Sequence, residues 1–144
     1  MNQMVDFLNQ QLSNWQILYV KLHHFHWNVT GKDFFVLHEK FEALYDETSG
    51  FIDDIAERVL ALDGIPLSKM ADYLEKGTIL EVEGALSSEE MVRQTVADFS
   101  QLVLQTKKGI DLASEKNDVA TEDLLTGIVV SLEKHIWLLE SFLK

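Results

Sequence analysis

Two pairs of side chains with metal-binding chemistry stand out near the middle of the sequence. His38 is followed four residues later by Glu42, and Asp53 is followed four residues later by Glu57. Residues four apart lie side by side on a helix. At about 100° per residue, all four positions fall within about 100° of one another, so they share one stripe of a single helix. The stripe combines imidazole and carboxylate groups, which suit divalent transition metals.

The two pairs are too far apart along this helix to share one metal ion. At 1.5 Å per residue, Glu42 and Asp53 are separated by ~16 Å. A second, antiparallel copy of the helix, related by a two-fold axis near residues 47–48, would bring Asp53 and Glu57 of one chain beside His38 and Glu42 of the other. Two identical sites would then form, as a symmetric interface requires.

A further histidine, His26, lies on the apolar seam of the preceding predicted helix. Two histidines and a carboxylate resemble the ligand set of non-haem ferrous iron. A di-iron site within one bundle uses Glu-x-x-His on two helices, and the chain contains no such tetrapeptide, which favours the shared site. The alternative is a solvated helix face on which Asp53 and Glu57 flank Arg58 and bind no metal.

The composition limits the classes of function that remain. The chain has 144 residues, 47% of them hydrophobic, which predicts one domain, residues 1–144, with a single core. It contains no cysteine, which excludes disulfides, thiolate zinc sites, iron–sulfur clusters and cysteine nucleophiles. The net charge of −12 repels phosphate backbones and attracts cations. No secretory signal or apolar run of the ~20 residues needed to span a membrane is seen, so we expect a cytoplasmic protein.

The apolar spacing predicts an all-α protein, because seven glycines and one proline fall between long stretches with steps of three and four. Four long helices with one long middle connection predict a ferritin-like four-helix bundle, with a short extra helix in the connection between the second and third helices. The expected elements are a helix over residues 3–29, a second from a cap at Asp33 to Leu62, a short one within 67–76, a third from a Ser87 and Glu90 capping box to Asn117, and a last one starting at Asp118 or Thr121.

Over essentially its whole length the sequence resembles the Dps-like mini-ferritins, particularly those of Gram-positive bacteria that lack a DNA-binding tail. The motifs that carry the resemblance are KLHHFHWNVTGKDFFVLHEKFEALYDE, the following DDIAERVLALDG, and a C-terminal EKHIW. The resemblance implies a hollow homododecamer that oxidises ferrous iron with hydrogen peroxide or dioxygen at its two-fold interfaces and stores ferric mineral, which protects against oxidative stress.

Carried over by position, the resemblance makes His26 and His38 of one subunit and Asp53 and Glu57 of its partner the iron ligands, for one or two ions per site. Glu42 stands where the family often has aspartate, as a direct or a water-mediated ligand. Zinc competes for the same nitrogen and oxygen ligands. Trp27 matches a tryptophan beside the family's site, where its ring could accept an electron; otherwise it is a packing anchor.

The same resemblance places an acidic cluster, with Asp118 and Asp123 as the best matches, at pores that would concentrate ferrous ions. The local alternative is that these acids cap a helix and complement its dipole. His23 and His24 are interpreted as bystanders, and His135 is interpreted as a core or interface histidine.

Two other functions remain as alternatives. A DNA-coating role is disfavoured because the predicted bundle leaves no lysine-rich arm to contact phosphates. A structural helical oligomer without metal chemistry would use the histidines and acids only to specify an interface.

Overall fold

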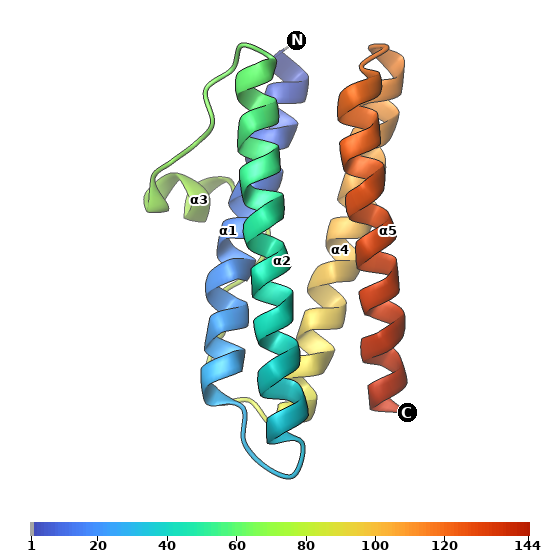
Figure 1. Cartoon of the computed structure of the whole chain (residues 1–144). Helices are drawn as coiled ribbons and strands as arrows, with labels where there is room; N and C mark the ends of the chain where they lie inside the picture. The colour runs from blue at the N-terminus through green and yellow to red at the C-terminus, as the bar shows by residue number, and fades with distance from the viewer. Residues whose placement is uncertain (1) are drawn as a thin grey trace. The chain divides into compact units, whose positions relative to one another are not determined.

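The computed structural model describes residues 2–144, and the elements within this range are all helices. Figure 1 shows them in chain order as α1 (Asn2–Asn28), α2 (Phe34–Ala61), α3 (Met70–Lys76), α4 (Ser88–Glu115) and α5 (Val119–Leu143). The four long helices begin and end within two residues of the predicted positions, and the short helix begins at Met70 rather than near Leu67. Every helix in the described part of the chain is too short or too polar to span a lipid bilayer.

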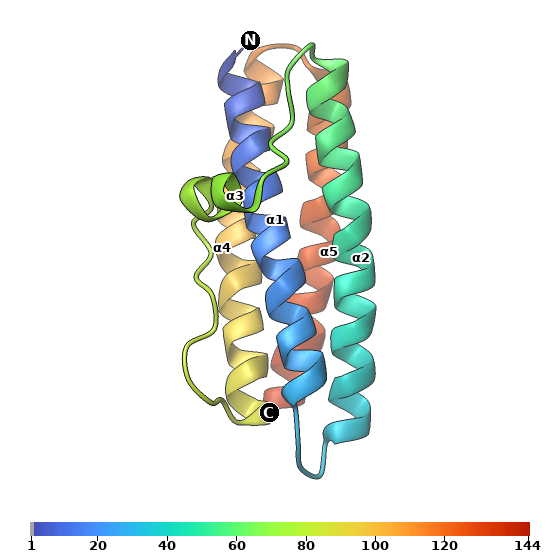
Figure 2. The same ribbon diagram turned by 90° about the vertical axis from the view of Figure 1, so that its left-hand side faces the viewer.

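The chain divides into two compact units, Met1–Met91 and Val92–Lys144. In the first, α1 and α2 form an antiparallel hairpin and α3 packs on α1 (Figure 2). Buried residues recur along α2 at steps of three and four, as the sequence predicts for an amphipathic helix. They are Leu37, Phe41, Leu44, Thr48, Ile55 and Val59.

The turn between α1 and α2 contains Gly31, whose φ of 102° explains the preference for glycine there. The prediction that Asp33 caps α2 is only half right. Asp33 occupies the N-cap position, but its side chain makes no capping hydrogen bond. Its φ of −99° and ψ of 15° are near-helical, so only its backbone carbonyl accepts, from the Leu37 amide at 2.9 Å.

Two asparagines of α1 fasten the long connection that follows α2. Asn9 donates to the Ile65 carbonyl at 3.1 Å and accepts from the Leu67 amide at 3.0 Å. Asn14 accepts from the Thr78 amide at 2.6 Å. These bonds satisfy backbone groups that the connection cannot pair internally, and they hold both sides of α3 against α1.

The capping signals of α4 and α5 are confirmed. The Ser87 amide donates to Glu90 Oε2 at 2.8 Å, and the Glu90 amide donates to Ser87 Oγ at 3.1 Å, which completes the capping box. Of the two candidates for the start of α5, Asp118 is the N-cap, and it accepts from the Thr121 amide at 3.1 Å.

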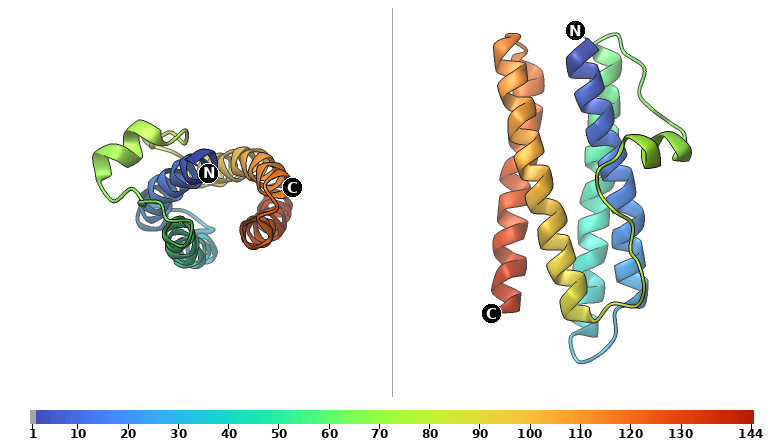
Figure 3. Two further views of the ribbon diagram at one scale, coloured as in Figure 1. Left: turned by 90° about the horizontal axis from the view of Figure 1, so that it is seen from above. Right: turned by 180° about the vertical axis from the view of Figure 1, so that it is seen from behind.

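In the second unit α4 and α5 run antiparallel, as Figure 3 shows. The Phe99 and His135 rings lie 6.2 Å apart, and Lys107 Nζ lies 3.3 Å from a Glu133 carboxylate oxygen. Both contacts join the two helices along their length.

Candidate metal centre

A reciprocal pair of histidines lies where α1 ends and α2 begins. His26 Nδ1 donates to the His38 carbonyl at 2.6 Å, and His38 Nδ1 donates to the His26 carbonyl at 2.7 Å. The two rings stack with centroids 3.8 Å apart and planes 11° apart. The hairpin turn makes this possible, because it returns α2 beside the last turn of α1.

The two backbone bonds decide which nitrogen of each ring is available to a metal. A carbonyl oxygen only accepts hydrogen bonds, so each Nδ1 must carry the proton. In the neutral imidazole, each Nε2 then keeps its lone pair, and a fixed Nδ1–H partner is the usual arrangement behind a metal-binding histidine. His26 and His38 are therefore prepared in the tautomer that binds metal through Nε2.

Glu42 lies on the Nε2 side of this pair. Its Oε1 atom is 3.8 Å from His26 Nε2, and its side chain is 53% exposed whereas that of His26 is 8% exposed. The carboxylate thus borders the face from which a cation would reach His26. Three of the five predicted metal ligands are gathered at this end of the hairpin.

The other two predicted ligands form a separate carboxyl pair further along α2. Asp53 and Glu57 are both exposed. The pKa of Glu57 is raised above its ordinary value, first by the negative charge of Asp53, then by a hydrogen bond with Asp53, by burial and by the charge of Asp54. A bound cation would relieve this repulsion, because it would take the place of the shared proton.

The two groups do not meet within one chain. Among residues 2–144, no three histidine or acidic side chains lie close enough to hold a metal ion together. The stripe that carries Glu42, Asp53 and Glu57 lies about 150° around α2 from the buried residues, at 100° per residue. A site using both groups still requires ligands from a second molecule.

An aromatic cluster adjoins the histidine pair. The sequence analysis did not identify two of its members, Tyr45 and His23, as part of the site. The Tyr45 ring meets His26 edge-on at 5.3 Å, and His23 stacks on Tyr45 at 3.7 Å. His23 Nδ1 also donates to the Tyr19 carbonyl at 2.7 Å. Burial, followed by the charges of Glu42 and Asp46 and the neighbouring Tyr19, raises the pKa of the Tyr45 phenol above its ordinary value. Positions 19, 23 and 26 share a helix face, which is the signal that could have identified this cluster.

Trp27 projects from the cluster rather than into the core. Its side chain is 70% exposed, and its ring lies 5.3 Å from His23. Within this chain it is therefore not the buried packing anchor of the alternative interpretation.

The acidic residues near the start of α5 have an observed local role. Asp118 accepts from Thr121 Oγ1 at 2.5 Å in addition to the Thr121 amide, so it is a helix cap. Asp123 is exposed in the second turn. The cap does not exclude a pore, and the pore stays a prediction.

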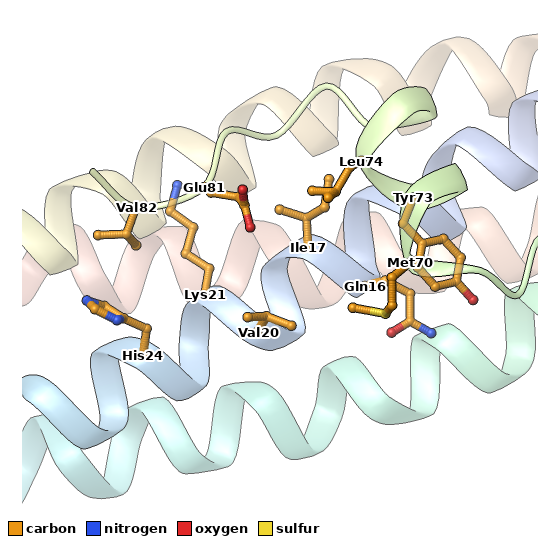
Figure 4. A pocket seen from close by; sticks show the side chains of 10 residues that line it. All are labelled: Gln16, Ile17, Val20, Lys21, His24, Met70, Tyr73, Leu74, Glu81 and Val82. Atoms are coloured by element: carbon orange, nitrogen blue, oxygen red, sulfur yellow. The ribbon is translucent and has the colours of Figure 1, made fainter. Parts of the chain in front are cut away.

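A pocket of 280 Å³ lies apart from these groups, between α1, α3 and the connection at residues 81–82 (Figure 4). Its walls are mainly apolar, with Val20, Met70 and Leu74 at the exposed edge. The buried Lys21 donates to the Leu80 carbonyl at 2.8 Å, so its ammonium group fastens the connection. The pocket includes none of the predicted metal ligands.

Comparisons with known proteins identify the family of the chain. A model of the ferritin-like domain matches residues 5–144. The DNA protection during starvation protein of Brevibacillus brevis is 53% identical over 137 residues, which cover 95% of this chain and 92% of the relative. The chain belongs to the Dps branch of the ferritin-like family.

Solved Dps structures show the same fold. The Dps protein from Bacillus brevis superimposes with a TM-score of 0.98 at 51% identity, covering 99% of this chain and 96% of that one. Dps from Vibrio cholerae, described as a member of a broad superfamily of ferritin-like diiron-carboxylate proteins, gives a TM-score of 0.96 at 34% identity, covering 99% of this chain and 90% of that one. The predicted fold class, a ferritin-like four-helix bundle with a short extra helix, is confirmed.

Proposed function

We propose that this Dps-family chain stores iron and detoxifies it by oxidising Fe(II) to Fe(III) at sites shared between two subunits. The observation that carries the proposal is the His26 and His38 pair, whose Nδ1 atoms are tied to backbone carbonyls. Such a pair presents two Nε2 ligands in one direction at little entropic cost. Family membership supports iron as the metal.

The shared site would combine His26 and His38 of one subunit with Asp53 and Glu57 of its partner. Glu42, beside His26 Nε2, would bind either directly or through water. Nitrogen and carboxylate ligands of this kind suit ferrous iron, and zinc competes with iron for them. One or two ferrous ions would bind per site as the substrate.

The reaction balances with hydrogen peroxide as oxidant. Two ferrous ions give up one electron each, and one peroxide takes two electrons and two protons to form two waters. With dioxygen as the oxidant, two ferrous ions and two protons reduce one dioxygen to one hydrogen peroxide, which two further ferrous ions then reduce to water. Because both electrons come from iron, no hydroxyl radical is released, and the ferric ions hydrolyse into mineral inside a hollow homododecamer. This chemistry would protect the cell against oxidative stress.

Trp27 would guard the site when only one ferrous ion is bound. In that case peroxide lacks its second electron, and an oxidisable indole near His26 could supply it through the His23 and Tyr45 rings.

At the start of α5, Asp118 and Asp123 would line a pore that concentrates ferrous ions as they enter the hollow oligomer.

A mixed-oligomer experiment tests the shared site. One variant carries His26→Asn with His38→Asn, whose amides can still donate to the two carbonyls but offer no Nε2. The other carries Asp53→Ala with Glu57→Ala on the exposed stripe. Each alone should lose rapid ferrous oxidation with peroxide, followed by ferric absorbance. Co-assembly at equal amounts should restore about a quarter of the wild-type rate, because each random two-fold pair recreates intact sites at that frequency.

Asp54→Ala, one residue from Asp53 but off the stripe, is the matched control and should keep the wild-type rate. Absence of recovery in mixed oligomers whose composition is verified by mass spectrometry would contradict a shared site. Wild-type protein that neither binds nor oxidises ferrous iron would contradict the function itself.

A further inference from the structure

The stripe of α2 that carries the proposed ligands also carries two large apolar side chains. Phe35 is 82% exposed and Leu60 is 57% exposed. At 100° per residue, both fall within about 60° of His38, inside the range spanned by His38, Glu42, Asp53 and Glu57. The stripe therefore begins and ends with an apolar side chain that is largely exposed within its own chain.

These two residues are placed symmetrically about the ligands. Phe35 lies three residues before His38, and Leu60 lies three residues after Glu57. In an antiparallel pair of α2 helices that sets His38 opposite Glu57 of the partner subunit, Phe35 necessarily lies opposite Leu60 of the partner subunit. One register thus pairs metal ligands with metal ligands and apolar residues with apolar residues.

From this coincidence we propose that Phe35 packs on Leu60 of the partner subunit at both ends of a two-fold α2 interface, forming an apolar clamp. The inference rests on the proposed function, because the register comes from the shared site. The clamp would lie ~4.5 Å, just under one helical turn, beyond each metal site.

The sizes of the side chains along the stripe support the same pairing. Near the two-fold axis the stripe carries the exposed residues Asp46 and Ser49, and the exposed Gly50 lies at its edge, where an added Cβ would meet no atom of its own chain within 4 Å. Crossing helices approach most closely at the crossing point and diverge toward their ends. The small Ser49 and Gly50 near the centre and the large Phe35 and Leu60 at the ends match that profile, and the same register sets Asp46 opposite Ser49 of the partner subunit.

Oppositely charged residues lie just beyond the two ends of α2. Lys32 lies six residues before His38, and Asp63 lies six residues after Glu57, and both are exposed. Lys32 lies in the turn before α2 and Asp63 in the turn after it, so an antiparallel pair of α2 helices brings these opposite charges to the same end of the interface. Opposite charges at both ends favour the antiparallel arrangement over a parallel one.

The clamp gives the interface a specific function at the metal site. It would shield the end of each site farthest from the two-fold axis, and excluding water there strengthens the interaction between ligands and cation. Apolar contacts that surround a polar centre commonly act in this way at protein interfaces.

Cysteine cross-linking tests the clamp without any metal, because the chain has no cysteine of its own. The variant with Phe35→Cys and Leu60→Cys should form a covalent dimer under mild oxidation. Within one chain the two positions are ~37 Å apart along α2, so the bond can only join two chains. Either substitution alone should give no cross-link. The matched control pairs Leu60→Cys with Val36→Cys, which is also exposed but lies about 100° around the helix.

Mass spectrometry should find the cross-link between the peptides that contain positions 35 and 60. Equal cross-linking by the Val36 control, or by either single variant, would overturn the clamp, as would no cross-link in protein that light scattering shows to be assembled.

A charge-reversal pair covers the case in which the cysteine variant does not fold. Phe35→Glu should weaken assembly with helicity retained, and adding Leu60→Lys should restore assembly. Unchanged assembly of Phe35→Glu would overturn the proposal. All these measurements use metal-free protein, so the clamp can fail while iron oxidation stands, and iron oxidation can fail while the clamp stands.

Discussion

At the scale of single residues, metal binding depends on which ring nitrogens of the histidines already make hydrogen bonds. Each ring of the His26 and His38 pair uses one nitrogen to bond a backbone carbonyl and keeps the other for a ligand. Spacing along the sequence predicted that His38 lies on the ligand stripe and His26 on the apolar seam, and His26 is indeed buried. It could not reveal the reciprocal bonds, because these depend on the path of the turn between α1 and α2.

The raised pKa of Glu57 gives a pH dependence with a definite sign. Protons should compete with a cation at higher pH than for an ordinary glutamate, because Asp53 first, and Asp54 last, raise this pKa. Asp54→Asn removes one of these charges without touching a proposed ligand. The acid midpoint of cobalt(II) binding, followed by its visible spectrum, should therefore move to lower pH in this variant. A midpoint that stays or rises would contradict the assignment of Glu57 as a ligand.

The raised pKa of Glu57 also makes the folding stability of the metal-free protein depend on pH. Metal binding should weaken as pH falls, whereas this contribution to stability should weaken as pH rises. An acid whose pKa is raised by folding stabilises the folded state below its ordinary pKa and ceases to do so as pH rises through the folded-state value. Metal-free wild type should lose more stability than Asp54→Asn between pH 4 and pH 7, as measured by urea unfolding.

The proposed guard at Trp27 is tested by the products of the reaction. Trp27→Phe should leave assembly and the rate of ferrous oxidation close to wild type, because the side chain is exposed and is not a ligand. With less than one ferrous ion per site and excess peroxide, a spin trap should detect more hydroxyl radical from the variant. Equal radical yields would leave Trp27 without a redox role.

At the scale of elements, the helices and their ends were the most predictable features. The capping box at Ser87 and the cap at Asp118 follow from local chemistry, which needs no knowledge of distant residues. Asp33 is the exception: it occupies the N-cap position of α2, but its near-helical backbone is accompanied by no capping hydrogen bond from its side chain. The stack of Tyr45 on His23 was missed because it joins two helices, and spacing within either helix cannot show such a contact.

The two interpretations of Asp118 can be separated by substitution. Asp118→Asn keeps a side-chain oxygen for the Thr121 amide, so it should stay within about 0.5 kcal/mol of wild type in stability, whereas Asp118→Ala should lose ~1 kcal/mol. If Asp118 also lines a pore, Asp118→Asn should slow mineral formation at unchanged stability, as followed by ferric absorbance and urea unfolding. Mineral formation at the wild-type rate would reduce Asp118 to a cap.

At the scale of the whole molecule, charge favours metal ions over nucleic acid. With a net charge of −12, the chain should not retain DNA in a gel-shift assay, even at low salt where phosphate contacts are strongest. The assay should use metal-free protein, because bound cations could bridge protein and DNA. Tight DNA binding under these conditions would support the DNA-coating alternative.

The organisation of the chain as one domain and its cytoplasmic location also stay predictions.

The crossed bonds between His26 and His38 have a consequence for the folding of the hairpin. The proposed iron ligands also join the two helices on either side of the turn, so the same side chains that would bind iron hold the hairpin together. Oxidative damage to either ring would then open the turn as well as remove a ligand. Amide hydrogen exchange at residues 29–33 should therefore report the chemical integrity of the site even when no metal is present.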